Sequence, residues 1–301
     1  MILIQNLRSA GIILTKASGS KRAWIAVFSF VLYSVVVSAQ SLQDVLKANA
    51  IEINPADTTL NQKLVDILGS HRIIMVGEMH GTQEPARFVS YVLRQLLKSG
   101  RTVNLGLEIP HTQMGEFISS PSVSSLKRSF FFREGFKDGR NSKEWFDLIA
   151  AYTGNPYVKL FFFDVDPDAN VSSPDSGMYT LVKKAIIQRP QAITVLLGGN
   201  IHNRLLPFRY GKTLACYLQA DLPPELQPGI LSINHQYKFG AMQNYTSAGF
   251  GIHKVEPTPS TYSETVPFKR YFSLLKSSTG PYNAVFYTEE VTPASSMDVV
   301  K

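Results

Sequence analysis

The sequence predicts an α/β fold with a largely parallel central sheet and flanking helices. Three observations predict it. Short apolar runs such as RIIMVGE and VKLFFFDVD have the composition of strands buried on both faces. Amphipathic segments with helical period lie between these runs over the first two thirds of the chain. A strand, a helix and a further strand follow one another within about 40 residues, as in a right-handed βαβ unit with parallel strands.

The first elements come in this order. Residues 43–70 are predicted to be a helical lead-in, with a cap at Asp57–Thr59 before LNQKLVDILG. A strand is expected over 72–78 and a second over 102–110, where Pro110 stops it. Between them, residues 82–100 place Phe88, Val89, Val92, Leu93, Leu96 and Leu97 on one helical face.

The middle of the chain starts with a less regular segment. Residues 111–140 combine a serine-rich stretch with an aromatic cluster, and we interpret them as an insertion that could close as a lid over the strand ends. A helix is expected from Asn141 or Ser142, a third strand over 158–166, a helix over 177–190 and a fourth strand over 192–203. Later strands are predicted in TLACYLQA, ILSINHQY, FGIHKV and YNAVFYTEEV, with room for antiparallel additions to the sheet.

The first 39 residues have the layout of a secretory signal. Four basic residues and no acid precede an apolar run that ends in Val37-Ser38-Ala39. We expect cleavage there, a single mature domain over 40–301 and a periplasmic or secreted protein that meets the membrane only through this segment. An uncleaved anchor is the alternative, but the run is short for a span. Removing the leader lowers the net charge from +7 to 7 − 4 = +3, which does not indicate a nucleic-acid partner. Cys216, the single cysteine, is predicted to be a buried structural thiol.

Polar side chains follow all four predicted parallel strands. In strand order they are Glu78 and His80, then Glu108, then Asp164 and Asp166, then Asn200 and His202. Ligands of parallel α/β sheets bind outside the carboxyl ends of the strands, so we expect these groups to share one cleft. Two carboxylates and two imidazoles could hold a divalent metal such as zinc, manganese or iron. Without a metal, one of these groups could serve as a general base for water.

Three motifs resemble one superfamily. They are G-E-x-H-G at 77–81, GLEIP at 106–110 and LLGGNIHNR at 196–204. Together they resemble the erythromycin esterases, the haem-binding ChaN lipoproteins and the Tiki proteases, and the ending YNAVFYTEEVTPASS resembles exported bacterial proteins related to ChaN. The resemblance spans roughly residues 70–293. It implies an α/β fold with the site at the sheet edge.

The same resemblance assigns residues to that site. Glu78 and His80 match the superfamily's first-strand Glu and His, Glu108 its second-strand Glu, and His202 its late histidine. The erythromycin esterase motif has one more residue between Glu and His, and the closer spacing here is that of the ChaN and Tiki branches. Macrolide hydrolysis is therefore not implied.

Structural roles compete with functional ones at each position. Glu78 and His80 could form a hydrogen-bonded strand-end pair, and His202 could cap a helix. Asp164 and Asp166 lie in DVDPD, which is also good turn chemistry. Arg140 could bind a substrate carboxylate or phosphate, or complete a turn and cap.

Two functions follow from these expectations. The first is hydrolysis of an ester or amide in a small molecule or peptide, with or without a metal, using Glu78, His80, Glu108 and His202. The second is a haem- or iron-complex-binding uptake protein without catalysis, for which SFFFREGF and Tyr179 could supply the slot and an axial ligand. Carboxylates crowded beside an anionic porphyrin are unfavourable, which favours the hydrolase, whereas the ChaN branch of the resemblance favours haem binding. A structural or interaction protein with a relict site is the third alternative.

Overall fold

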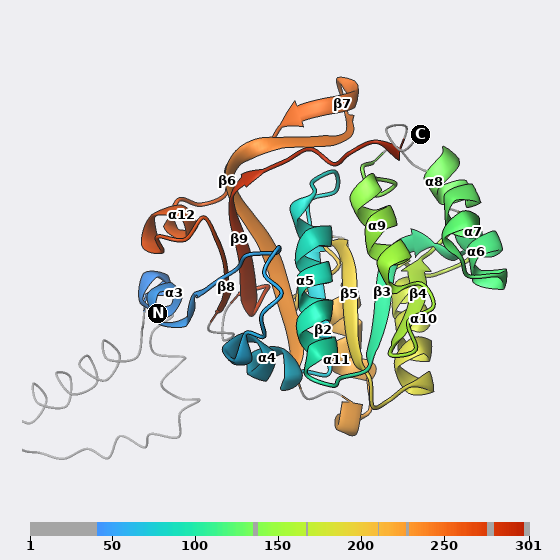
Figure 1. The fold of residues 1–301 in the computed structure, drawn as a ribbon, viewed down its shortest axis with the longest axis horizontal. Coiled ribbons are helices and arrows are strands. Elements are labelled where there is room, and N and C mark those ends of the chain that lie inside the picture. The colour runs from blue at the N-terminus through green and yellow to red at the C-terminus, as the bar shows by residue number, and fades with distance from the viewer. Residues whose placement is uncertain are drawn as a thin grey trace, which may run out of the picture. The chain divides into compact units, whose positions relative to one another are not determined.

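A nine-stranded mixed sheet forms the centre of the computed structural model (Figure 1). The structure describes residues 41–134, 138–166, 168–209, 211–226, 229–275 and 280–297. The predicted signal segment over 1–39 lies outside these residues. The described strands are β1 (Ile51–Glu52), β2 (Ile73–Glu78), β3 (Val103–Pro110), β4 (Val158–Asp164), β5 (Ile193–Gly199), β6 (Ile230–Thr246), β7 (Gly249–Lys254), β8 (Arg270–Leu274) and β9 (Ala284–Val291).

The strand order is β1-β8-β9-β6-β2-β5-β3-β4, with β7 paired to β6. The pairs from β9 to β4 are all parallel, while β1, β7 and β8 pair antiparallel with their neighbours. The predicted α/β class and largely parallel sheet are therefore confirmed. β2 and β3 are parallel but not adjacent, because β5 lies between them.

Helices cover both faces of the sheet. The described helices are α3 (Leu42–Asn49), α4 (Gln62–Gly69), α5 (Glu84–Lys98), α6 (Gly115–Ser119), α7 (Val123–Arg128), α8 (Phe130–Glu134), α9 (Lys143–Tyr152), α10 (Pro174–Gln188), α11 (Leu214–Asp221) and α12 (Thr261–Thr265), with short 3₁₀ turns at His111–Met114 and Pro224–Leu226. Figure 1 shows α5 and α9 in front of the strands, with α10 and α11 behind them. Within the described ranges, none of these helices has the length and apolar character needed to cross a membrane.

Each face of the sheet has its own apolar core. Alternate residues of β2 point to opposite faces, so Ile74 and Val76 pack with α5 and α9, while Ile73 and Met75 pack with α10 and α11. A buried strand with apolar residues on both faces is what RIIMVGE predicted. These two apolar layers cover the sheet on both faces.

Two local predictions were wrong. TLACYLQA is helix α11, because Thr213 caps it by accepting a hydrogen bond from the Cys216 backbone N–H, and Cys216 is buried on this helix. The residue that caps α4 is Asn61, whose side chain accepts from Leu64 N, whereas Asp57 accepts from Thr59 in the preceding turn. A short apolar run cannot separate a strand from a helix by periodicity, and several polar residues in a row offer competing caps.

The segment predicted as an insertion contains the 3₁₀ turn and helices α6, α7 and α8. Phe131 and Phe132 of α8 are buried, and they pack edge to face with each other. Its role as a lid stays a prediction.

The long strand β6 forms hydrogen bonds with the turn that follows β2. Gln243 N–H donates to the Gly81 carbonyl at 2.8 Å, and the Asn244 side chain donates to the His80 carbonyl at 3.0 Å. Gly81 has φ +94°, and a Cβ placed on it would overlap the Gln243 carbonyl oxygen. The glycine after His80 is therefore required both by its backbone conformation and by this close approach.

We expect Gly81→Ala to lower the free energy of unfolding by roughly 3 kcal/mol, since left-handed strain and backbone overlap add. Gly100→Ala is the matched control, because Gly100 has φ +78° but open space around it. That variant should lose only about 1 kcal/mol from strain. Urea unfolding of both variants measures the difference, and equal losses would show that the β6 contact imposes no constraint.

Candidate functional site

The carboxyl ends of β2, β3, β4 and β5 bring the sequence-predicted polar residues to one edge of the sheet. Glu78 is the last residue of β2, Asp164 the last of β4, and Glu108 lies near the end of β3. His202 follows β5 by three residues. Parallel strands thus place side chains that are far apart in sequence side by side.

Glu78 and His80 form a tight pair. Nδ1 of His80 lies 2.7 Å from Oε1 of Glu78. The Glu78 side chain is fully buried, whereas that of His80 is 22% exposed. The other carboxylate oxygen of Glu78 has no hydrogen-bond partner among the described residues. The carboxylate thus orients the ring from behind and leaves Nε2 as the accessible atom.

Glu108 lies at the centre of the cluster. Its Oε2 accepts from Gly199 N–H at 2.5 Å, and its Oε1 accepts from Nη1 of Arg140 at 3.0 Å. Nε2 of His80 and Nε2 of His202 lie 3.6 Å and 3.8 Å from that same Oε1. Both imidazoles therefore face one carboxylate oxygen from beyond hydrogen-bond distance.

His202 has its own carboxylate partner. Its Nδ1 lies 2.8 Å from Oδ1 of Asp175, which also accepts from Leu214 N–H at 2.7 Å. Asp175 lies in the first turn of α10, and its role was missed from sequence, where it reads only as a favourable acid at a helix N-terminus. The site thus contains two carboxylate-backed histidines, Glu78–His80 and Asp175–His202.

Arg140 is buried and uses its guanidinium within the protein. Nη1 donates to the backbone carbonyl and carboxylate of Glu108 and to Asp164, and Nε and Nη2 contact Asp138. Of the two roles left open for Arg140, this engagement favours the structural one, and it gives Asp164 a place in the cluster. Asp166 instead accepts a hydrogen bond from Thr112. Asp138 was not predicted as a site residue, because DGR reads as a turn.

Two glycines at the end of β5 make this crowding possible. A Cβ on Gly198 would lie 2.6 Å from Oε2 of Glu108, and one on Gly199 would lie 3.3 Å from Nε2 of His80. Side chains at either position would displace the central carboxylate or the imidazole. The GG of LLGGNIHNR is thus explained by close approach.

The charges in the cluster and the burial of its side chains shift the pKa values of its residues. Burial would lower the pKa of His80, but the Glu108 and Glu78 carboxylates outweigh it and raise that pKa to about 10. Burial would raise the pKa of Glu108, but Arg140, His80 and His202 hold it well below its usual range. The pKa of His202 is raised, because Asp175 and Glu108 outweigh its burial. Burial raises the pKa of Glu78, so its pair with His80 keeps a proton to alkaline pH.

The same contacts bear on the predicted metal. Both imidazole Nδ1 atoms and both Glu108 oxygens already have protein partners, and a guanidinium lies against the central oxygen. Among the described residues, no group of three or more His, Cys, Asp or Glu side chains is arranged to hold an ion. A divalent metal held by Glu78, His80, Glu108 and His202 therefore stays a prediction.

The groups expected to serve haem lie elsewhere. Phe131 and Phe132 are core residues, and Tyr179 of α10 stacks on Tyr217 of α11 at 5.6 Å between ring centroids. Packing thus engages Phe131, Phe132 and the Tyr179 ring, and haem binding stays a prediction.

Comparison with known proteins places the fold. No family model matches the sequence, and no curated protein sequence is similar to it. In structure, the chain is similar to a succinoglycan biosynthesis protein with TM-score 0.66 and 10% identity, over 86% of this chain and 100% of that one. It is similar to the erythromycin esterase EreC in its open conformation with TM-score 0.60 and 10% identity, over 82% and 98%.

The chain is less similar to haem-binding ChaN of Campylobacter jejuni, with TM-score 0.39 and 11% identity over 64% of this chain and 91% of that one. The fold that the resemblance implied is confirmed by the similarity to the erythromycin esterase. At these identities the similarity shows the fold alone.

Proposed function

We propose that the protein is a hydrolase that cleaves an ester or amide with the Glu78–His80 pair as its base. The observation that carries this proposal is the pair of carboxylate-backed histidines whose Nε2 atoms face one oxygen of Glu108. Such a carboxylate fixes the ring so that Nδ1 carries its proton and Nε2 can exchange one. The histidines are the more exposed members of the cluster, so a substrate reaches them first.

The reaction uses each residue at a stated atom. Neutral His80 accepts a proton from water at Nε2 while the water oxygen bonds to the carbonyl carbon and the carbonyl electron pair moves to its oxygen. The resulting oxyanion is stabilised by Nε2–H of protonated His202, which Asp175 holds in place. When the tetrahedral intermediate collapses, the bond to the leaving group breaks and His80 returns the proton to it.

Glu108 is a positioning residue in this scheme. Its low pKa and its bonds to Arg140 and Gly199 make it a poor proton carrier. Its charge instead holds both imidazoles toward one point and raises their pKa values. A fixed anion of this kind keeps His202 positive without taking its proton.

The pH dependence of the reaction follows from His80. Because the neutral ring is the base and its pKa lies at about 10, kcat/KM should rise with pH through the mildly alkaline range. It should fall again where His202, whose raised pKa keeps the oxyanion donor charged, loses its proton. Glu108→Gln removes the charge that raises this pKa most, so the rise should move to lower pH. Initial rates on an active ester across pH measure both profiles, and a profile that Glu108→Gln leaves in place would contradict the assignment of the base.

The substrate is a small molecule or peptide, met outside the cytoplasm after removal of the 1–39 segment. N-terminal sequencing of the mature protein should start at Gln40. An intact 23–39 segment in the membrane fraction would contradict export with cleavage.

A further inference from the structure

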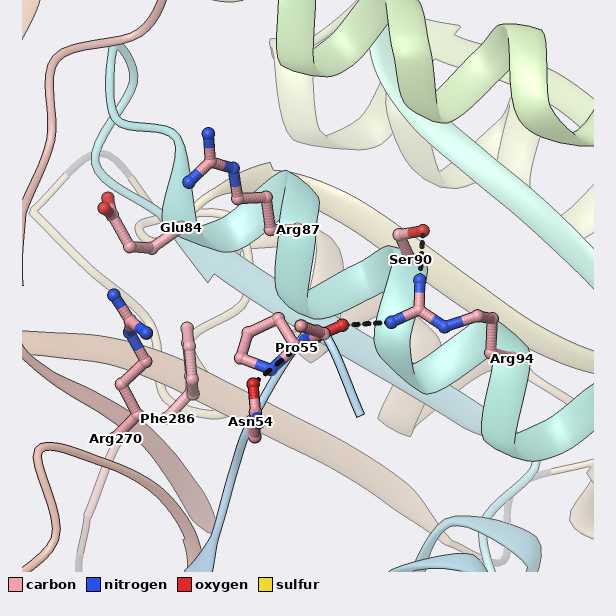
Figure 2. A pocket seen from close by; sticks show the side chains of 9 residues that line it. Asn54, Pro55, Glu84, Arg87, Ser90, Arg94, Arg270 and Phe286 are labelled. Atoms are coloured by element: carbon pink, nitrogen blue, oxygen red, sulfur yellow. Dashed lines mark hydrogen bonds between the residues drawn. The ribbon is translucent and has the colours of Figure 1, made fainter. Parts of the chain in front are cut away.

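A pocket of about 350 Å³ lies between α5, the loop at residues 54–56, and strands β8 and β9 (Figure 2). None of its lining residues belongs to the cluster around Glu108. Figure 2 shows Glu84 between Arg87 and Arg270 at one end of the pocket, with Arg94 and Ser90 at the other. The pocket is therefore a separate feature with its own set of charges.

The two arginines at the first end are available to a ligand. Arg94 already donates to the Ser90 hydroxyl and to the Pro55 carbonyl. By contrast, the side chains of Arg87 and Arg270 are exposed and have no hydrogen bond or ion pair with the described residues. Two unpaired guanidinium groups, one from α5 and one from β8, give this end of the pocket an excess of positive charge and planar donors suited to an oxyanion.

Glu84 adds a second and independent signal. It is 4% exposed, and one of its oxygens accepts from Thr292 N–H at 3.0 Å. Its other oxygen, Oε2, is buried without a hydrogen-bond partner among the described residues. A buried carboxylate oxygen without a donor is costly, and this one belongs to a residue that lines the pocket. A ligand that satisfies both the guanidinium groups and this oxygen must accept hydrogen bonds from the arginines and donate one to Glu84.

We propose that this pocket is a binding site for hydrogen phosphate, an oxyanion that retains one proton. Its bare oxygens accept from Arg87 and Arg270, and its remaining O–H donates to Oε2 of Glu84. Sulfate has the same shape and charge but no proton in this pH range, so it would place a bare oxygen against the Glu84 carboxylate. The Glu84 carboxylate thus favours hydrogen phosphate over sulfate, because it attracts the proton of the first and repels the bare oxygen of the second.

The test is calorimetric titration of the full chain with inorganic phosphate and with sulfate in a mildly alkaline buffer that contains neither anion. Burial raises the pKa of Glu84, and an alkaline buffer keeps its carboxyl ionised. We expect phosphate to bind at least about tenfold more tightly than sulfate, because one charge-assisted hydrogen bond is gained and a repulsion avoided. Arg270→Ala should weaken phosphate binding by about tenfold or more for the same reason, while Arg101→Ala, with the same change in net charge, should not.

Glu84→Gln gives the outcome specific to this proposal. The amide removes the carboxylate but offers a donor, so phosphate and sulfate should bind this variant alike. Thermal unfolding of each variant without ligand checks that it is folded. Equal binding of the two anions by the parent protein, phosphate binding that Arg270→Ala leaves unchanged, or no phosphate binding by the folded parent would overturn the proposal.

Discussion

Arg140→Met is expected to lower the free energy of unfolding by about 3–5 kcal/mol, the usual cost of leaving buried charges without their partner. Arg140 is 8% exposed and forms ion pairs with three carboxylates, those of Glu108, Asp138 and Asp164. Methionine fills much of the same volume, so the loss reports on charge and hydrogen bonds rather than on a cavity. Chemical denaturation gives the value.

Two further variants make this result interpretable. Arg140→Lys keeps the charge but cannot form the same fork of hydrogen bonds, so it should lie between the parent and Arg140→Met. Lys143→Met breaks an exposed pair with Asp147 and should cost less than about 1 kcal/mol. Similar losses for Arg140→Met and Lys143→Met would refute a structural role for the buried guanidinium.

Glu78→Gln is expected to reduce turnover by about 10²-fold or more, the usual contribution of a positioned acid or base. Glutamine keeps the size of the side chain and can still meet His80, but it removes the charge that orients and polarises the ring. Stability should be unchanged or raised, because the buried Glu78 carboxylate has one oxygen without a partner. Glu116→Gln, on an exposed acid of α6, is the control and should change neither quantity.

A haem titration tests the alternative function, haem binding without catalysis. If the chain carried haem, a saturable Soret shift should survive Glu78→Gln, because a carboxylate is not the expected axial ligand. Turnover absent from the parent protein together with such a shift would favour the binding function over the proposed hydrolase.

The parallel strands and the residues that follow them could be predicted from sequence because both signals are local. An apolar run such as RIIMVGE specifies a doubly buried strand, and the sheet then brings Glu78, Glu108 and His202 to one edge. Parallel strands have their carboxyl ends at the same edge of the sheet whatever their order in it. The insertion of β5 between β2 and β3 therefore still leaves Glu78, Glu108 and His202 at the same edge.

What the sequence could not reveal depends on pairing between distant elements. Asp175 lies on α10 and meets His202 only because both reach the same strand ends, and no local signal marks that contact. The sequence allows Arg140 to be a substrate ligand, but in the structure its guanidinium pairs with Glu108, Asp138 and Asp164. Helix α11 was mistaken for a strand because an eight-residue apolar run fits either structure.

The central claim is that Glu78 and His80 act as one base, and a double-mutant cycle on turnover tests it most directly. Initial rates are measured on one panel of simple esters and peptides for the parent protein, Glu78→Gln, His80→Ala and the double variant. If the pair acts as a unit, His80→Ala loses about 10²-fold or more, and adding Glu78→Gln to it costs almost nothing further. Losses that multiply in the double variant, or full turnover in His80→Ala, would contradict the account.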